Sequence, residues 1–137
     1  MRILAVDFGD VHTGVSISDP TGFLASGSMT INSRNMQEVA RQVLELAREN
    51  GCKELVVGYP RNMNGSIGER AKKCEEFARL LEKNGACNVI LWDERLTSVD
   101  ANRILSNAGK KRKKQKQLVD AVAASLILQS YLDSRRR

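Results

Sequence analysis

Three acidic residues lie at points where a cluster of carboxylates could assemble. Asp7 directly follows the apolar run 3–6, and Glu94 comes shortly after the apolar run 89–92. Asp120 lies in the first turn of an expected helix, where the helix dipole favours a negative charge. Carboxylates at close range disfavour each other's ionisation unless a cation compensates. The three positions therefore predict a metal site.

The chemistry of these donors indicates a hard divalent cation. Carboxylate oxygens suit Mg2+ or Mn2+ better than zinc, and the chain has only one histidine, His12. We expect His12 to lie in a turn with no obvious partner and to take no catalytic role. Two ions held by such carboxylates can activate a water and stabilise the leaving oxygen of a phosphodiester. We therefore interpret Asp7, Glu94 and Asp120 as candidate catalytic residues and candidate ligands of Mg2+ or Mn2+.

Each of these acids also has a plainer structural interpretation. Asp7 could be a turn residue, Asp120 a charge at a helix N-terminus, and Glu94 an ion-pair partner of Arg95 or a lysine. Asp93 is a further alternative to Glu94. Neighbours on a strand point to opposite faces, so only one of the two can face the metal unless the strand has already ended. The residues leave this choice open, and we select Glu94.

Hydrophobic patterning predicts the elements that would position the acids. Continuous apolar runs predict buried strands near 3–6, 54–58 and 89–92, and period-two alternation predicts an antiparallel meander up to Ile31. Capping residues and apolar stripes predict helices at about 36–49, 67–83, 98–108 and 118–132, of which the last is apolar almost all round and should be buried. Hairpin strands followed by alternating strands and helices indicate a three-layer α/β fold with a mixed sheet. Ligand sites in such sheets gather at the carboxyl ends of the parallel strands.

Length and composition fit one domain spanning 1–137. The chain has 137 residues, of which 42% are hydrophobic. Its three isolated cysteines form no CxxC pair and have no histidine at zinc spacing, which indicates a reduced, cytosolic protein without structural zinc. No stretch approaches the roughly 20 apolar residues of a membrane span. We expect a cytoplasmic protein that does not contact membranes.

The positive charge is concentrated in two segments. The chain carries a net charge of +6, and removing the nine charges of 110–116 and 135–137 leaves a remainder of −3. A mildly acidic domain with basic segments suits a metal centre that works on phosphates. We expect 109–117 to form a basic, mobile loop that contacts nucleic acid, although a merely solvated charge run is the alternative. The candidate contacts there are Lys110, Lys111, Arg112, Lys113 and Lys114.

With these residues in place, the chain resembles the YqgF/RuvX family, a bacterial branch of the RNase H-like superfamily that also includes RuvC-type Holliday junction resolvases. The resemblance covers nearly the whole length and rests on four ordered motifs, at 7–19, 58–66, 93–98 and 120–132. It implies a five-stranded RNase H-like sheet flanked by helices in an α/β/α arrangement. It also implies a cytoplasmic nuclease that either matures the 5′ end of pre-16S ribosomal RNA or resolves Holliday junctions. We favour the first activity.

By position, Asp7, Asp93–Glu94 and Asp120 match the acidic residues of the family. Further residues look similar to phosphate-contacting elements, although loop closure and helix capping explain them equally well: Arg61, Asn62, Ser66, Arg95 and Thr97. The chain departs from the family at Val11–His12, where a Lys-Arg pair is usual. This departure shifts the expected grip on substrate towards Arg61, Arg95 and the basic run.

Two other classes of function compete with a nuclease. Asp7-x-Gly9 followed by Gly14 also resembles the phosphate motif of actin-like ATPases and sugar kinases, but those proteins need two such domains. A non-catalytic nucleic-acid-binding ribosome-assembly factor is the other alternative. Such a binder has no physical need for three clustered carboxylates. The residues do not distinguish RNA from DNA, and we expect a monomer or a weak dimer.

Overall fold

The computed structural model describes residues 2–22, 24–60, 68–85, 87–93 and 112–135, and it describes only the backbone of 112–121. In this part of the chain, five strands form one mixed sheet in the order β3-β2-β1-β4-β5. The strands are β1 (Ile3–Asp7), β2 (His12–Ser18), β3 (Ala25–Asn32), β4 (Glu54–Tyr59) and β5 (Asn88–Asp93). The helices are α1 (Met36–Glu49), α2 (Glu69–Asn84) and α4 (Arg112–Arg135). The expected α/β fold with a five-stranded mixed sheet is confirmed.

The sheet combines an antiparallel meander with a parallel half. β1 pairs with β2 antiparallel and with β4 parallel, β2 pairs with β3 antiparallel, and β4 pairs with β5 parallel. β1 and β4 are central strands covered on both faces, which explains why their sequences are continuous apolar runs. The carboxyl ends of β1, β4 and β5 therefore lie at one edge of the sheet.

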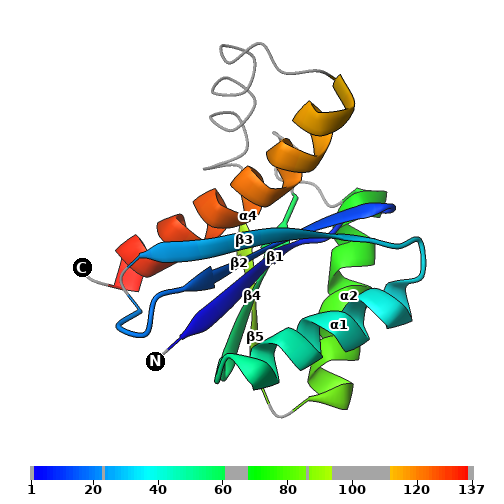
Figure 1. The fold of residues 1–137 in the computed structure, drawn as a ribbon. Coiled ribbons are helices and arrows are strands. Elements are labelled where there is room, and N and C mark those ends of the chain that lie inside the picture. The colour runs from blue at the N-terminus through cyan, green and yellow to red at the C-terminus, as the bar shows by residue number, and fades with distance from the viewer. Residues whose placement is uncertain (1, 23, 61–67, 86, 94–111, 136–137) are drawn as a thin grey trace.

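The helices form a layer on each side of the sheet (Figure 1). α1 and α2 cover one face, and α4 crosses the other. The predicted start of α1 is confirmed, since Asn35 Oδ1 accepts a hydrogen bond of 3.2 Å from the Glu38 backbone N–H. Its end is followed by Gly51, whose φ of 68° is a left-handed conformation that favours glycine.

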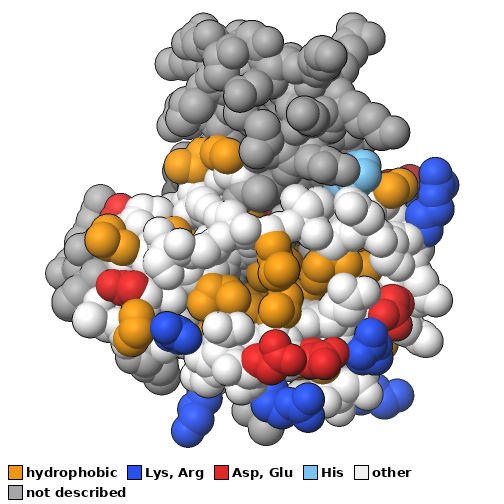
Figure 2. All heavy atoms as spheres, in the orientation of Figure 1, with side chains coloured by type: hydrophobic (Ala, Val, Ile, Leu, Met, Phe, Trp, Pro, Cys, Tyr) orange, Lys and Arg blue, Asp and Glu red, His pale blue; other side chains and the backbone are white. Residues whose placement is uncertain are grey.

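Two apolar cores lie on the two faces. The larger core fills the space under α1 and α2, where the rings of Phe8 and Phe77 stack with centroids 4.5 Å apart. The smaller core lies under α4 and joins residues of β1, β4 and α4: Ile3, Ala5, Val56, Ile127, Leu128, Tyr131 and Leu132. Figure 2 shows apolar side chains near the centre of the face that Figure 1 presents, with charged side chains of both signs below them.

The last helix differs from its prediction in two ways. Its described part already includes Arg112, well before the expected start near residue 118, so most of the expected basic loop 109–117 is helical from Arg112 onward. Lys, Arg and Gln are good helix formers, and a charge run inside such a sequence continues a helix instead of breaking it. The helix is also buried along one stripe and not all round, because Ser125, Leu126 and Gln129 are only half-buried.

Other expectations fall on parts of the chain with less description. The predicted helix at 98–108 lies outside the described residues, as does Ser66 of the expected capping box. The described α2 starts at Glu69 after Gly68, which provides no side-chain cap. Among the described residues, no helix combines the length and the apolar character that crossing a membrane requires.

Candidate active site at the carboxyl edge of the sheet

Asp7 ends β1 at the carboxyl edge and has a glycine beside it on both neighbouring strands. It pairs with Gly14 of β2, and the pairing of Val6 with Val57 brings Gly58 of β4 alongside it. Asp7 is half-buried, and both glycines are buried. Neither of these two glycines places a side chain beside the carboxylate.

The side chain of Asp7 belongs to the face of the sheet that α4 covers. Ile3 and Ala5 pack in the core beneath α4, and residues two apart on a strand share a face. Leu4 and Val6 instead belong to the core beneath α1 and α2. A partner of Asp7 on a neighbouring strand must therefore also point to the α4 face.

Asp93 belongs to the opposite face. It ends β5 opposite Tyr59 of β4, which packs in the core beneath α1 and α2. Val89 shares this face, whereas Ile90 and Trp92 pack beneath α4. Asp93 and Asp7 thus lie on different sides of the sheet, and the structure does not bring them together. Glu94, the residue that we selected, lies outside the described residues.

Asp120 lies in the helical backbone of α4, eight residues after Arg112, so it is not in the first turn as expected and does not gain from the dipole there. Its side chain is outside the described part. It precedes Tyr131 by eleven positions in the sequence, or about three turns of an α-helix. Among the side chains that are described, no three of His, Cys, Asp or Glu form a group that could hold a metal ion. Of the three proposed ligands, Asp7 is the one whose side chain lies in the described part of the structure.

α4 is held at its C-terminal end by a buried carboxylate. Glu54, which is 8% exposed at the start of β4, accepts hydrogen bonds from the Tyr131 hydroxyl and, at 3.0 Å, from Arg135 Nη1. Burial raises the pKa of Tyr131 to about 12, and the neighbouring Glu54 carboxylate adds to the rise. These bonds fix the position of α4 along its axis, and with it the position of Asp120.

Hydroxyl groups tie the middle of α4 to the sheet. Ser125 Oγ lies 2.5 Å from Ser28 Oγ of β3 and donates to Ser16 Oγ of β2 at 3.2 Å. Trp92 Nε1 of β5 donates to Ser130 Oγ at 3.2 Å. Directional bonds to both halves of the sheet restrain the rotation of α4 about its axis.

The turn after β1 is tight, and α2 braces it. A Cβ at Gly9 would lie 2.1 Å from the His12 carbonyl oxygen, so only glycine fits there. Arg70 Nη2 donates to the Phe8 carbonyl at 3.1 Å, and Lys73 Nζ lies 3.1 Å from Asp10 Oδ1. The hydrogen bond and charge of Lys73 lower the pKa of Asp10. Arg70 and Lys73 thus bring two positive charges to this turn, and that of Lys73 is paired with Asp10.

Sequence reasoning did not single out Arg70 or Lys73. Their spacing of three places them on one side of the first turns of α2, and this was the available signal.

Sequence reasoning also found no partner for His12. In the structure, His12 Nδ1 lies 2.6 Å from Asn32 Oδ1 of β3. His12 shares its face with Gly14 and Ser16, so the pair lies on the α4 side of the sheet.

The predicted substrate contacts cannot be placed in the same way. Arg61, Asn62, Ser66, Arg95, Thr97, Lys110 and Lys111 lie outside the described residues. Arg112, Lys113 and Lys114 lie in the first turn of α4, where only the backbone is described.

Comparison with known proteins identifies the family. Residues 1–134 match the model of a family described as "RuvX: Holliday junction resolvase". The chain belongs to the RuvX family. A RuvX relative from Acetivibrio thermocellus is 46% identical over 137 residues, covering 98% of this chain and 97% of the relative. A relative from Moorella thermoacetica is 47% identical over 133 residues, covering 97% of this chain and 95% of the relative. Both relatives carry the name "Putative pre-16S rRNA nuclease".

Solved structures confirm the RNase H-like fold of this RuvX protein. RuvC of T. thermophilus in complex with a Holliday junction substrate has a TM-score of 0.59 and 12% identity, covering 99% of this chain and 96% of that one. The fowlpox virus resolvase in complex with Holliday junction DNA has a TM-score of 0.61 and 15% identity, covering both chains completely. At these identities the likeness concerns the fold.

Proposed function

We propose that this RuvX protein is a divalent-metal-dependent nuclease that cleaves structured nucleic acid, with the 5′ region of pre-16S ribosomal RNA as its substrate. The observation that carries the proposal is the position of Asp7. It ends a central strand on the α4 face, with Gly14 and Gly58 on either side. The names of the relatives from Acetivibrio thermocellus and Moorella thermoacetica support the choice of substrate.

Asp7, Glu94 and Asp120 would hold the metal, and Mg2+ or Mn2+ fits these oxygen donors. The alternation of side chains along β5 supports Glu94 over Asp93 as the metal ligand. Ile90 and Trp92 face α4, so a strand that continued for one more residue would place Glu94 on the same face as Asp7. α4, which carries Asp120, lies on that face as well. When bound, the ion would supply Lewis-acid chemistry at the phosphodiester and lower the pKa of an attacking water.

The residues around Asp7 would bind the nucleic-acid backbone. Arg70 and Lys73 carry positive charge to the turn after β1, and the His12–Asn32 pair lies on the same face as Asp7. Phosphate contacts position a nucleic acid without reading its sequence. The family resemblance and the loss of the Lys-Arg pair add Arg61, Asn62, Ser66, Arg95 and Thr97 to this grip, and the basic run adds Lys110, Lys111, Arg112, Lys113 and Lys114. We place the enzyme in the cytoplasm, acting as a monomer or a weak dimer.

Resolution of Holliday junctions is the second candidate, and the description of the matching family favours it. A four-way junction has two strands to cut and needs two active sites, so this activity requires a dimer on the substrate. A non-catalytic assembly factor is the third possibility. It predicts nucleic-acid binding that does not depend on Asp7.

The test is cleavage of pre-16S RNA and of a four-way DNA junction by purified wild type and Asp7→Asn, in Mg2+, Mn2+ and EDTA. Loss of a partner in the outer shell of a metal site costs about 10–100-fold, so loss of a ligand should cost about 100-fold or more. Asp133→Asn is the matched control, because Asp133 is exposed at the far end of α4. Circular dichroism checks that both variants fold. Equal cleavage by Asp7→Asn and wild type would overturn the proposal, and metal-dependent cleavage of the junction alone would select the second candidate.

A further inference from the structure

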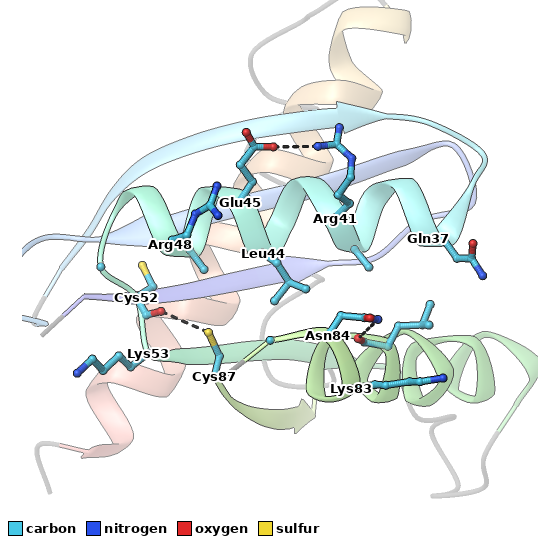
Figure 3. A pocket seen from close by; sticks show the side chains of 15 residues that line it. Gln37, Arg41, Leu44, Glu45, Arg48, Cys52, Lys53, Lys83, Asn84 and Cys87 are labelled. Atoms are coloured by element: carbon cyan, nitrogen blue, oxygen red, sulfur yellow. Dashed lines mark hydrogen bonds and ion pairs between the residues drawn. The ribbon is translucent and has the colours of Figure 1, made fainter.

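A concave surface lies on the α1–α2 side of the molecule. It is a half-open groove of about 1220 Å³ between α1 and α2, closed at one end by Cys52, Lys53 and Cys87 (Figure 3). Lys53 and Cys87 directly precede β4 and β5, so this end of the groove lies at the amino ends of those strands, whereas Gln37 at the start of α1 lines the opposite end. No residue of the candidate active site lines it.

The floor of the groove is apolar. Leu44 of α1 points into the space between the helices, with Ala40 on the same helix and Leu80 on α2. A Cβ at Gly85 would lie 2.6 Å from Leu44 Cδ2, so glycine is what lets Leu44 approach the end of α2. Burial raises the pKa of the Cys52 thiol, which keeps it protonated and unsuited to act as a nucleophile. The groove has the character of a binding surface and not of a reaction site.

The rim of the groove carries an excess of positive charge. Arg48, Lys53 and Lys83 are exposed there, and none of them has an ion pair within the described part of the chain. The acidic lining residue, Glu45, is already paired with Arg41 at 3.0 Å. Three cationic side chains therefore surround an apolar floor without an acidic partner.

This combination selects the kind of occupant. The described lining has no aromatic side chain on which a base could stack, and an apolar floor does not suit phosphates. A second copy placed groove to groove would bring the positive rims together, which like-charge repulsion opposes. The volume exceeds the roughly 300–1,000 Å³ of small-molecule pockets. A groove between two helices suits an amphipathic helix laid along it.

We propose that the α1–α2 groove is a docking site for an acidic amphipathic helix of a partner protein. Apolar side chains at positions i, i+3, i+4 and i+7 of the partner would cover Leu44 and Leu80. Glutamates or aspartates at its edges would pair with Arg48, Lys53 and Lys83. The protein would thereby bind its partner on the α1–α2 face while the face that carries Asp7 stays open to nucleic acid.

The experiment is a selection of displayed random 16-residue peptides on the folded wild-type protein, with counter-selection on Lys53→Glu/Lys83→Glu. Enriched peptides should be net acidic with apolar residues at helical spacing. Their affinity should fall at least tenfold on the double variant and also fall with added salt. Lys83→Glu should weaken binding, whereas Lys72→Glu, an exposed charge of α2 outside the groove, should not. Amide shifts at Leu44, Lys53 and Lys83 would locate the peptide in the groove.

Several outcomes would overturn the proposal. One is that no peptide is enriched over the counter-selected variant, and another is that the enriched peptides have no acidic excess. A 16-nucleotide RNA that shifts the same amides and displaces the peptide would assign the groove to nucleic acid. Self-association that Lys53→Glu/Lys83→Glu abolishes would assign it to a second copy of the chain. Because the groove variants leave the Asp7 site intact, their cleavage activity should equal that of wild type, so this test is separate from that of the proposed nuclease.

Discussion

The two faces of the sheet differ in the size of their apolar cores and in the hydrogen bonds that accompany them. Beneath α1 and α2 lies a large apolar core with stacked phenylalanines. On the other face, α4 covers a smaller core and is also bonded through Ser125, Ser130 and Tyr131. Hydrophobic burial is non-directional, whereas hydrogen bonds fix distance and orientation. Directional contacts thus hold α4 in its middle and at its C-terminal end, whereas those on the other face, from Arg70 to the Phe8 carbonyl and from Tyr59 to Glu75, hold the first half of α2.

The largest expected effect comes from the same substitution, Leu→Ala, made once in each apolar core. Leu81 of α2 and Leu128 of α4 are both fully buried, and Leu→Ala should lower the free energy of unfolding by about 2–5 kcal/mol at each site. Urea denaturation of the two variants measures it. Because hydrogen bonds also hold α4, Leu128→Ala should still cleave substrate when folded. A loss of activity confined to Leu128→Ala would show that packing, and not these bonds, positions the helix.

The next effect separates the two faces by activity. Glu94→Gln should lower kcat by about 100-fold if Glu94 is a metal ligand on the α4 face. Asp93→Asn is the matched control, because Asp93 shares the other face with Tyr59, and its kcat should stay within about threefold of wild type. Steady-state kinetics at saturating Mg2+ measures both. If Asp93→Asn lowered kcat more than Glu94→Gln, the assignment of Glu94 to the α4 face would be refuted.

Two tyrosine–glutamate pairs allow a smaller comparison. The Tyr131 hydroxyl donates to buried Glu54, and the Tyr59 hydroxyl donates to half-buried Glu75 at 2.5 Å. Tyr131→Phe should cost about 1–3 kcal/mol of unfolding free energy, because it removes a partner of a buried acceptor. Tyr59→Phe should cost less, since water can reach Glu75. Only Tyr131→Phe should also slow cleavage, because α4 carries Asp120.

Tyr131 should also make the stability of the protein depend on pH. Its folded pKa, about 12, exceeds the ordinary value of 10.0, so its contribution to stability is complete below pH 10 and is lost as the pH rises towards 12. Chemical denaturation across this range should show a steeper loss of stability for wild type than for Tyr131→Phe. Parallel curves for the two proteins would contradict the buried pairing with Glu54.

The smallest expected effect lies on the exposed surface of α1. Hydrogen bonds from Arg41 and Gln42 lower the pKa of Glu38 from 4.5 to about 2. The resulting stabilisation is present above pH 4.5 and is lost as the pH falls through 4.5 towards 2. Glu38→Gln should therefore flatten the acid side of the stability curve and change little at cleavage pH, because exposed ion pairs contribute weakly. Thermal melts between pH 2 and 7 measure the difference.

Local patterns in the sequence predicted much of this fold. The apolar runs predicted β1, β4 and β5, and Asn35 with Glu38 predicted the start of α1, because these signals involve neighbouring residues. The start of α4 was predicted at least six residues too late, since charge density was interpreted as a loop signal despite the helix propensity of Lys and Arg.

The surroundings of Asp7 depend on pairing between distant segments, and the sequence did not reveal them. The register of β1 with β2 and β4 places Gly14 and Gly58 beside Asp7, and Arg70 reaches the Phe8 carbonyl from a helix 62 positions later. Such contacts follow from tertiary packing and leave no periodic signal. The positions of Glu94 and Asp120 within the site remain predictions.

Because the side chains of β1 alternate between the two faces of the sheet, the number of strand residues before Asp7 decides which face its carboxylate points to. One residue inserted into β1 before Asp7 would turn the carboxylate into the core beneath α1 and α2, although the composition of the strand would hardly change. Two inserted residues would restore the face but carry the acid past Gly14 and Gly58. Natural and engineered variants of this enzyme should therefore tolerate substitutions in β1 far better than changes in its length.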